Sequence, residues 1–135
     1  MKPQIFTKAI TVSPSAIDAR NHVNNLTYLE WCLDAAEAHW ESNASLALKE
    51  NYVWYVLEHT IIYKAPAFEG EELNVETWVT TAEGARSERH YKIFRPKDQK
   101  LLVEAKTLWC LLDAHSQKPT KITDEIRNLF LKSEE

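Results

Sequence analysis

The residues with the clearest chemical potential lie in one short stretch, between Asp18 and Asn25. The stretch contains a carboxylate at Asp18, an imidazole at His22, and side-chain amides at Asn24 and Asn25. A helix N-terminus presents free backbone N–H groups and a partial positive charge, which stabilise an anion or a polarised carbonyl oxygen. If a helix begins here, a base or nucleophile lies beside such an end. Acyl transfer requires this pairing of groups.

The residues that follow predict a long helix from Asn24 or Asn25 to about Trp40. Asparagine is a favoured N-cap, and we expect one of the two asparagines to cap the helix. Apolar residues at intervals of three or four predict the face that packs on the core: Leu26, Leu29, Leu33, Ala36 and Trp40. A second stripe is acidic: Glu30, Asp34, Glu37 and Glu41. We interpret this stripe as solvent-exposed rather than metal-binding, because His39 is not spaced to complete a Glu-x-x-His pair.

Alternating and β-branched residues predict the strands around this helix. We expect strands over 4–12, Tyr52–Tyr63, Glu72–Thr81, Arg86–Arg95 and Leu101–Asp113, with short helices over 43–50 and Asp124–Leu131. The order is a strand, a long helix and four strands joined mostly by hairpins. It predicts an α+β fold in a single domain over residues 1–135, with a curved antiparallel sheet wrapped around one central helix.

Composition limits the class of protein. The chain has 135 residues, 44% of them hydrophobic and 27% charged, as is usual for a soluble globular domain. A net charge of −4 argues against a nucleic-acid partner, and no apolar run is long enough for a membrane span. Cys32 and Cys110 have no metal-site spacing and lie in apolar runs, so we expect buried thiols and no metal. With no signal-peptide pattern at the N-terminus, we predict a cytoplasmic protein that needs no cofactor.

Positive charge is concentrated in residues 86–121, which carry nine basic and four acidic side chains. The interpretation that we favour is solvated strand faces that guard against aggregation. The functional interpretation is a docking surface for a phosphorylated ligand, with Arg86 and Arg89 as candidate contacts. These two arginines are three residues apart on a predicted strand, so they point to opposite faces.

For Asp18, two interpretations follow from the residue type. A local one is an Asx-turn that involves Arg20 or Asn21. The functional one places a thioester carbonyl oxygen at the N–H groups of Val23 to Asn25. Asp18 then either attacks the carbonyl to give a mixed anhydride or activates a water molecule as a general base, and the sequence leaves both open.

The other candidates also have a structural alternative. His22 either bonds the loop backbone or orients the carbonyl and moves a proton. Asn25 either caps the helix or holds the attacking water, and Asn24 and Val23 frame the thioester. Tyr28 and Trp31 are core residues or form a wall of the acyl pocket.

These residues carry a resemblance to a known family. The pattern Asp18-x-x-Asn21-His22-Val23-Asn24-Asn25-x-x-Tyr28 resembles the motif Asp-x-x-Gly-His-Val-Asn-Asn-x-x-Tyr of hotdog-fold acyl-CoA thioesterases. This is the 4-hydroxybenzoyl-CoA thioesterase-like group, which extends to plant acyl-ACP thioesterases. Residues 62–73 and 107–113 look like its strand-to-hairpin segment and its last strand. One departure is Asn21, which stands where the family has glycine. Asparagine tolerates a left-handed backbone better than most residues.

The resemblance implies a hotdog fold, Asp18 as the catalytic carboxylate, and backbone N–H groups at the helix start that polarise the thioester. It also implies a homodimer or homotetramer with acyl clefts at the subunit interface. We therefore expect hydrolysis of an acyl-CoA, or less readily an acyl-ACP, without a metal. The alternatives are an enoyl-thioester hydratase or dehydratase on the same fold, and a non-catalytic thioester-binding module.

Overall fold

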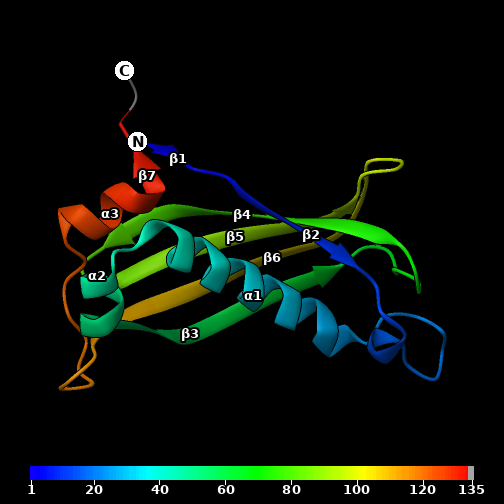
Figure 1. The fold of residues 1–135 in the computed structure, drawn as a ribbon, viewed down its shortest axis with the longest axis horizontal. Coiled ribbons are helices and arrows are strands. Elements are labelled where there is room, and N and C mark those ends of the chain that lie inside the picture. Colours follow the sequence, from blue (N-terminus) through cyan, green and yellow to red (C-terminus); the bar gives the residue numbers. More distant parts are fainter. Residues whose placement is uncertain (134–135) are drawn as a thin grey trace.

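A five-stranded antiparallel sheet and one long helix form most of the molecule (Figure 1). The computed structural model describes residues 1–133. The spatial order of the strands is β2 (Phe6–Thr11), β4 (Glu72–Glu83), β5 (Arg86–Arg95), β6 (Lys100–Asp113) and β3 (Tyr52–Tyr63). The strands β4, β5 and β6 follow one another by hairpins, and β3, which precedes them in the chain, forms the outer edge beside β6. This architecture confirms the predicted α+β class.

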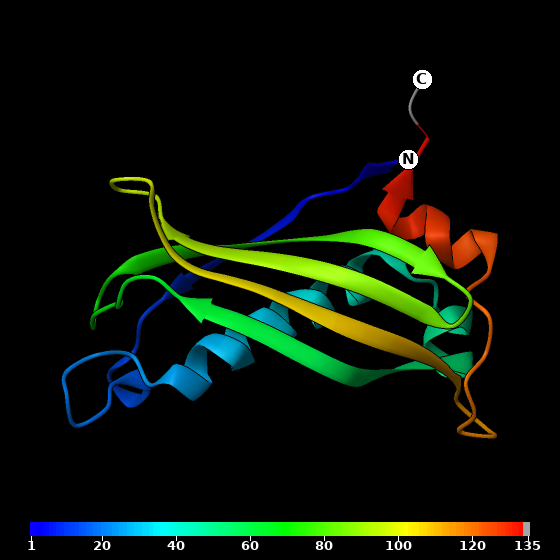
Figure 2. The same ribbon diagram turned by 180° about the vertical axis from the view of Figure 1, so that it is seen from behind.

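The long helix α1 (Asn25–Asn43) lies along one face of the sheet, and the view from behind shows no helix covering the other face (Figure 2). Residues on alternate positions of β4 are buried toward the helix, including Leu73, Val75 and Val79. Small side chains on α1, such as Cys32 and Ala35, let the helix approach the sheet closely. The core therefore lies between α1 and the concave side of the sheet.

The buried face of α1 differs from the predicted one. Its fully buried residues are Tyr28, Cys32, Ala35, Ala36 and His39, and of these only Ala36 belonged to the predicted apolar face. Leu26, expected in the core, is 68% exposed. The helix is apolar around most of its circumference, so spacing alone did not identify the side that meets the sheet. The acidic stripe is exposed, as predicted.

Most element boundaries agree with the sequence. The strands Tyr52–Tyr63 and Arg86–Arg95 are confirmed, and α1 runs three residues beyond the predicted end. The register shifts between Val56 and Glu58 in β3 and again within β4, and such bulges increase the twist of long strands. The short helices are α2 (Leu46–Asn51) and α3 (Asp124–Phe130), and a 3-10 turn, η1 (Pro14–Ala16), precedes the Asp18 stretch.

The two ends of the described chain lie side by side. The sequence did not reveal β1 (Lys2–Pro3) and β7 (Leu131–Lys132), which pair to form a second small sheet (Figure 1). Both strands have only two residues, too few for a periodic pattern. The predicted domain over 1–135 extends to Glu134 and Glu135, which lie outside the described residues.

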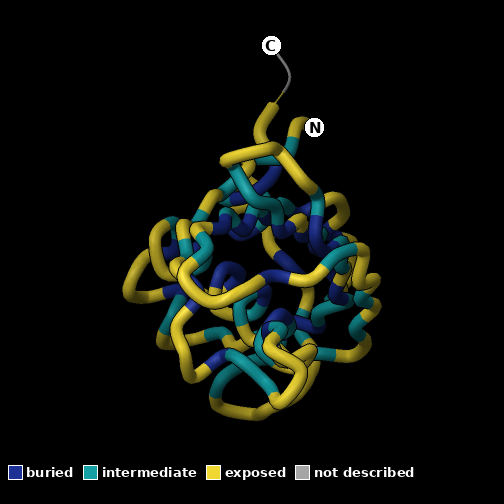
Figure 3. Tube along the Cα trace, turned by 90° about the vertical axis from the view of Figure 1, so that its right-hand side faces the viewer, coloured by how far each residue is buried: buried dark blue, intermediate teal, exposed yellow. Residues whose placement is uncertain are grey.

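Buried residues form two clusters along the long axis of the molecule. One surrounds Tyr28, Tyr91 and Val103, and the other surrounds Leu111 and Phe130 near the C-terminal end of α1. Seen along this axis, buried backbone lies inside and exposed loops lie around it (Figure 3). Within residues 1–133, no helix has the length and hydropathy that crossing a bilayer would demand.

Candidate active site

A tight turn between Asp18 and His22 leads the chain from η1 into α1. The N–H of Asp18 donates to the carbonyl oxygen of His22 at 2.8 Å, and the N–H of Asn21 donates to the carbonyl oxygen of Asp18 at 3.1 Å. Ile17 and Val23 close the turn through an antiparallel bridge. Asn21 has a φ of 64°, in the left-handed region that glycine and asparagine adopt most readily. Asparagine thus supplies the backbone conformation at the position where the resembling motif has glycine.

The carboxylate of Asp18 is fixed by backbone groups of this turn. Its Oδ1 atom accepts hydrogen bonds from the N–H of Arg20 at 2.9 Å and of His22 at 3.3 Å. The Asx-turn proposed from residue type is therefore present. Among residues 1–133, no basic side chain forms an ion pair with Asp18, and no hydrogen bond reaches Oδ2. The side chain is half-buried and lines a cavity, so one oxygen sets its orientation and the other is accessible.

The start of α1 supplies fewer free donors than the sequence suggested. Asn24 is the N-cap: its Oδ1 accepts from the N–H of Leu26 at 2.9 Å. The N–H of Val23 donates to Ala67 at 3.1 Å, and that of Asn24 donates to Ala16 at 2.8 Å. Of the three N–H groups expected to polarise a carbonyl, only that of Asn25 meets no acceptor within the described part of the chain. The candidate oxyanion donor is therefore the first residue of the helix.

A cavity of about 430 Å³ brings most of the predicted site residues together. Its lining comes from the Asp18 turn, the start of α1, and the end of β3 with the loop that follows it: Asp18, Arg20, His22, Val23, Asn24, Asn25, Tyr28, Tyr63, Lys64, Ala65 and Pro66. Five members were not predicted from the sequence: Arg20, Tyr63, Lys64, Ala65 and Pro66. Arg20 lies inside the motif, but Tyr63 and Lys64 are some forty residues away and only the fold brings them here.

Two tyrosines shape this cavity. Tyr28 is buried, and its hydroxyl oxygen accepts from the N–H of Ala67 at 2.8 Å, so the hydroxyl proton itself remains available for donation. Burial raises the pKa of Tyr28, and the negative charge of Glu71 and, less strongly, that of Asp18 add to the increase. Tyr63 donates from its hydroxyl to the carbonyl oxygen of Asn25 at 3.1 Å. Trp31 does not line the cavity but packs edge-on against Tyr28, with ring centroids 5.6 Å apart.

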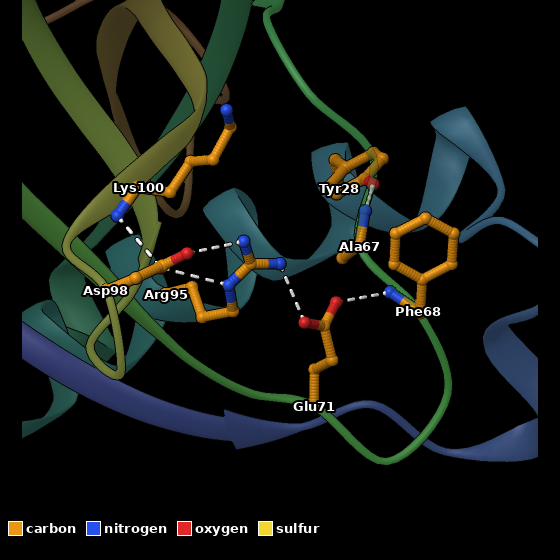
Figure 4. A network of polar contacts seen from close by, with 7 residues as sticks. All are labelled: Tyr28, Ala67, Phe68, Glu71, Arg95, Asp98 and Lys100. Atoms are coloured by element: carbon orange, nitrogen blue, oxygen red, sulfur yellow. Dashed lines mark hydrogen bonds and ion pairs between the residues drawn. The ribbon is translucent and has the colours of Figure 1, made fainter.

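The loop between β3 and β4 forms one wall of the cavity, and polar contacts with Arg95 hold the loop in place (Figure 4). Glu71 accepts from the N–H of Phe68 through Oε1 and pairs with Arg95 through Oε2, each at 2.7 Å. Arg95 also binds both carboxylate oxygens of Asp98 in the turn between β5 and β6. This bidentate pair lowers the pKa of Asp98 to about 2. The ring of His22 packs edge-on against Phe68, so the anchored loop positions the imidazole.

The structure does not bring the two predicted phosphate contacts to this cavity. Arg86 is exposed at the start of β5, opposite Cys110, whereas the cavity lies at the far end of β3. Arg89 is only 5% exposed and lies between the sheet and α1, where it donates to His39 and Thr77. The expectation that Arg89 contacts a docked phosphate on the surface is wrong, because its side chain points into the interior.

Neither cysteine is placed as an exposed nucleophile. Both cysteines are buried thiols, as predicted, and burial raises the pKa of Cys32 to about 12. In the described part of the chain, no group of three or more His, Cys, Asp or Glu side chains is arranged to hold a metal ion.

A family model matches most of the chain. Residues 12–130 match the model of the thioesterase-like superfamily. The chain belongs to this superfamily. No curated protein matches it.

Solved structures place this superfamily member in the hotdog fold. Slr0204, a 1,4-dihydroxy-2-naphthoyl-CoA thioesterase from Synechocystis, is 22% identical with a TM-score of 0.82, over 93% of this chain and 95% of that one. SAV2348 from Staphylococcus aureus, solved in complex with CoA, is 20% identical with a TM-score of 0.83, over 96% and 83%. The 12:0-ACP thioesterase from Umbellularia californica is 16% identical with a TM-score of 0.80, over 96% of this chain and 51% of that one. The predicted fold is thereby confirmed.

Proposed function

We propose that this protein hydrolyses an acyl-CoA thioester to a free acid and a thiol. The observation that carries the proposal is the Asp18 carboxylate, which lines one cavity together with the N–H of Asn25 at the positive end of α1. Membership of the thioesterase-like superfamily supports this reaction class. The known CoA thioesterase and the CoA complex among the similar structures support CoA as the carrier, and the ACP thioesterase makes acyl-ACP the second choice.

In the proposed reaction, the thioester oxygen accepts a hydrogen bond from the N–H of Asn25, and the helix dipole stabilises the developing oxyanion. Asp18 acts through Oδ2 in one of two ways. As a general base it removes a proton from water, which attacks the carbonyl carbon. As a nucleophile it forms a mixed anhydride and expels the thiolate, and water then cleaves the anhydride. In both routes the C–S bond breaks and the thiolate leaves with the bonding electrons before taking up a proton.

The neighbouring side chains have supporting roles in this proposal. Tyr28 retains a hydroxyl proton that it can donate to the attacking water or the thioester. His22 and the Asn25 amide line the cavity within the same turn and helix start, where they orient the water. Arg20 and Lys64 supply positive charge at the cavity for the phosphates of CoA, the role that the sequence had suggested for Arg86 and Arg89.

We also propose a homodimer or homotetramer in the cytoplasm. The outer strand β3 is long and exposes apolar side chains, which is typical of an edge that pairs with another chain. Two buried free thiols suit a reducing compartment.

A thiol-release assay with a panel of acyl-CoA substrates tests the reaction. We expect turnover by the wild-type protein and a loss of at least ~100-fold in kcat for Asp18→Asn, the scale for removing a general base. Asp34→Asn, the same chemical change at an exposed position of α1, is the matched control and should retain full activity. An unchanged kcat in Asp18→Asn refutes the assignment of Asp18. A wild-type protein that binds acyl-CoA but releases no thiol is a binding module instead.

A further inference from the structure

A second cavity of about 420 Å³ lies at the other end of α1 and shares no lining residue with the Asp18 cavity. It is lined by the C-terminal half of α1, by α2 and the beginning of β3, and by residues of β4, β5, β6 and α3. Most of its wall is apolar or aromatic, including Leu33, Ala36, Trp40, Val79 and Phe130. Its size and lining are those of a small-molecule site.

Four charged residues line this cavity: Glu37, Glu41, Lys49 and Arg89. Glu37 and Glu41 are exposed, and Glu41 pairs with Lys49 at 3.1 Å, so Arg89 is the buried charged group of the wall. Its side chain is 5% exposed, and Nη1 donates to Nδ1 of His39 and to Oγ1 of Thr77, each at 3.0 Å. The guanidinium carbon lies 5.2 Å from the ring centroid of Phe130. Because arginine can only donate, Nδ1 of His39 must accept, and Nε2 of the same ring then donates to Gln4 at 2.9 Å. Every partner of the guanidinium is therefore neutral.

The positive charge of Arg89 has no counter-ion within the described part of the chain. Within residues 1–133, no carboxylate lies at ion-pair distance from it, and no acceptor is hydrogen-bonded to its Nε or Nη2. Burial lowers the pKa of Arg89 to about 10, which leaves it protonated at neutral pH. Buried charges in proteins are usually paired, because an uncompensated ion loses its hydration. The Nε and Nη2 edge of a guanidinium matches the two oxygens of a carboxylate.

We propose that this cavity binds a small organic acid with an apolar body, whose carboxylate pairs with Arg89. The apolar wall holds the hydrocarbon or aromatic part, and the free edge of the guanidinium holds the two oxygens. The carboxylate has two possible sources: a free acid, or the distal carboxylate of a dicarboxylic acyl group. The binding step does not require hydrolysis at Asp18. The second source rests on the proposed function and on the proposed pairing of subunits through β3, because within one chain the two cavities lie at opposite ends of α1, farther apart than an eight-carbon acyl chain reaches.

Isothermal titration calorimetry at pH 7 tests the binding step with octanoate and benzoate, each compared with its uncharged analogue, octan-1-ol and benzamide. We expect at least one acid to bind at least about tenfold more tightly than its analogue, since hydrogen bonds to charged groups are the stronger ones. Arg89→Gln should abolish this preference. Lys106→Gln removes the same charge from an exposed position on β6 outside both cavities and should leave the preference unchanged.

A second variant keeps Arg89 intact. Ala36→Leu adds volume to the cavity wall from α1, so it should weaken binding of acids and analogues alike while circular dichroism reports a folded protein. Equal affinity for acids and analogues in the wild-type protein overturns the proposal. So does binding that survives both Arg89→Gln and Ala36→Leu, or no binding of either acid.

Kinetics distinguish the two sources of the carboxylate. If the ligand is a dicarboxylic acyl group, kcat/KM for octanedioyl-CoA should exceed that for octanoyl-CoA, and Arg89→Gln should remove the difference mainly through KM. If the two thioesters are hydrolysed equally while octanoate binds, the ligand is the free acid. If neither thioester is hydrolysed but acid binding depends on Arg89, the proposed function fails and the binding site stands.

Discussion

At the scale of single residues, the two oxygens of Asp18 have different environments. Oδ1 receives two backbone hydrogen bonds within its own turn, and Oδ2 receives none from residues 1–133. A side chain held in this way loses little further freedom when it reacts, which is the basis of catalytic preorganisation. The geometry depends on the left-handed backbone of Asn21, because that residue reverses the chain between Asp18 and His22.

The φ of 64° at Asn21 predicts the effect of a β-branched residue there. Asn21→Val should lower the free energy of unfolding by about 1–2 kcal/mol, the cost of a left-handed conformation for such residues. Asn21→Gly should be tolerated, because glycine adopts this backbone freely. Urea unfolding at pH 7 measures the change.

Ala19→Val is the matched control, since it adds a similar side chain at an exposed position of the same turn without a positive φ. If Ala19→Val and Asn21→Val destabilise the protein equally, backbone strain at Asn21 is not the cause.

At the scale of elements, α1 is joined to the sheet by a buried histidine. His39 stacks on Phe6 with ring centroids 5.0 Å apart and packs edge-on against Phe130 at 4.8 Å. Burial, with smaller contributions from the positive charges of Arg89 and Lys132, lowers its pKa to about 3. The neutral ring is the only form that can accept the hydrogen bond from Arg89.

This lowered pKa predicts acid sensitivity. The unfolded chain binds a proton at His39 below pH 6.5, whereas the folded protein does so only near pH 3. The contribution of His39 to the free energy of unfolding is therefore fully present above pH 6.5, and it is lost as the pH falls toward 3. From pH 7 to pH 5 this residue should remove about 2 kcal/mol from the free energy of unfolding.

Urea titrations at both pH values measure the decline in the wild-type protein and in His39→Gln, whose amide oxygen can still accept from Arg89. The variant should lose this part of the pH dependence, whatever its stability at pH 7. His115→Gln, a change at an exposed histidine, should retain it. An identical decline in His39→Gln and wild type would contradict the assignment.

At the scale of the whole molecule, β3 is an edge strand whose outer side has no partner strand within the described chain. In the dimer that we propose, two β3 strands pair antiparallel about a two-fold axis. The end of one strand, with Tyr63, then lies beside the beginning of the other, with Tyr52. This arrangement brings the Asp18 cavity of one subunit close to the Arg89 cavity of its partner.

Positive charge introduced on β3 should weaken the association of the subunits. Tyr55 and Leu57 are 59% and 42% exposed, so Tyr55→Lys with Leu57→Lys should fold yet weaken association and reduce thiol release. Leu46→Lys, on α2 and 71% exposed, is the control and should remain associated. Light scattering coupled to size exclusion measures the mass. A wild-type monomer, or a double variant with unchanged mass, would contradict pairing through β3.

Local patterns determined much of this protein. The alternating strands from Tyr52 to Asp113, a helix cap at Asn24 or Asn25 and the Asp18 motif could be recognised in the sequence, because hydrogen bonding and side-chain alternation within a segment depend on near neighbours. The choice of Asn24 as the cap came from the structure. The turn at Asn21 was implied by the glycine of the resembling motif, and asparagine adopts the same left-handed backbone more readily than most residues.

Only the tertiary structure decided which side of α1 is buried, because the helix is apolar on several sides and the sheet selects the face with Tyr28, Cys32 and Ala35. It also showed that the N–H groups of Val23 and Asn24 bond to Ala67 and Ala16, and that Arg89 points inward. Each of these depends on contacts between segments far apart in the chain. Sequence spacing determines which residues share a face, but the partner that a face meets is set by packing of the whole chain.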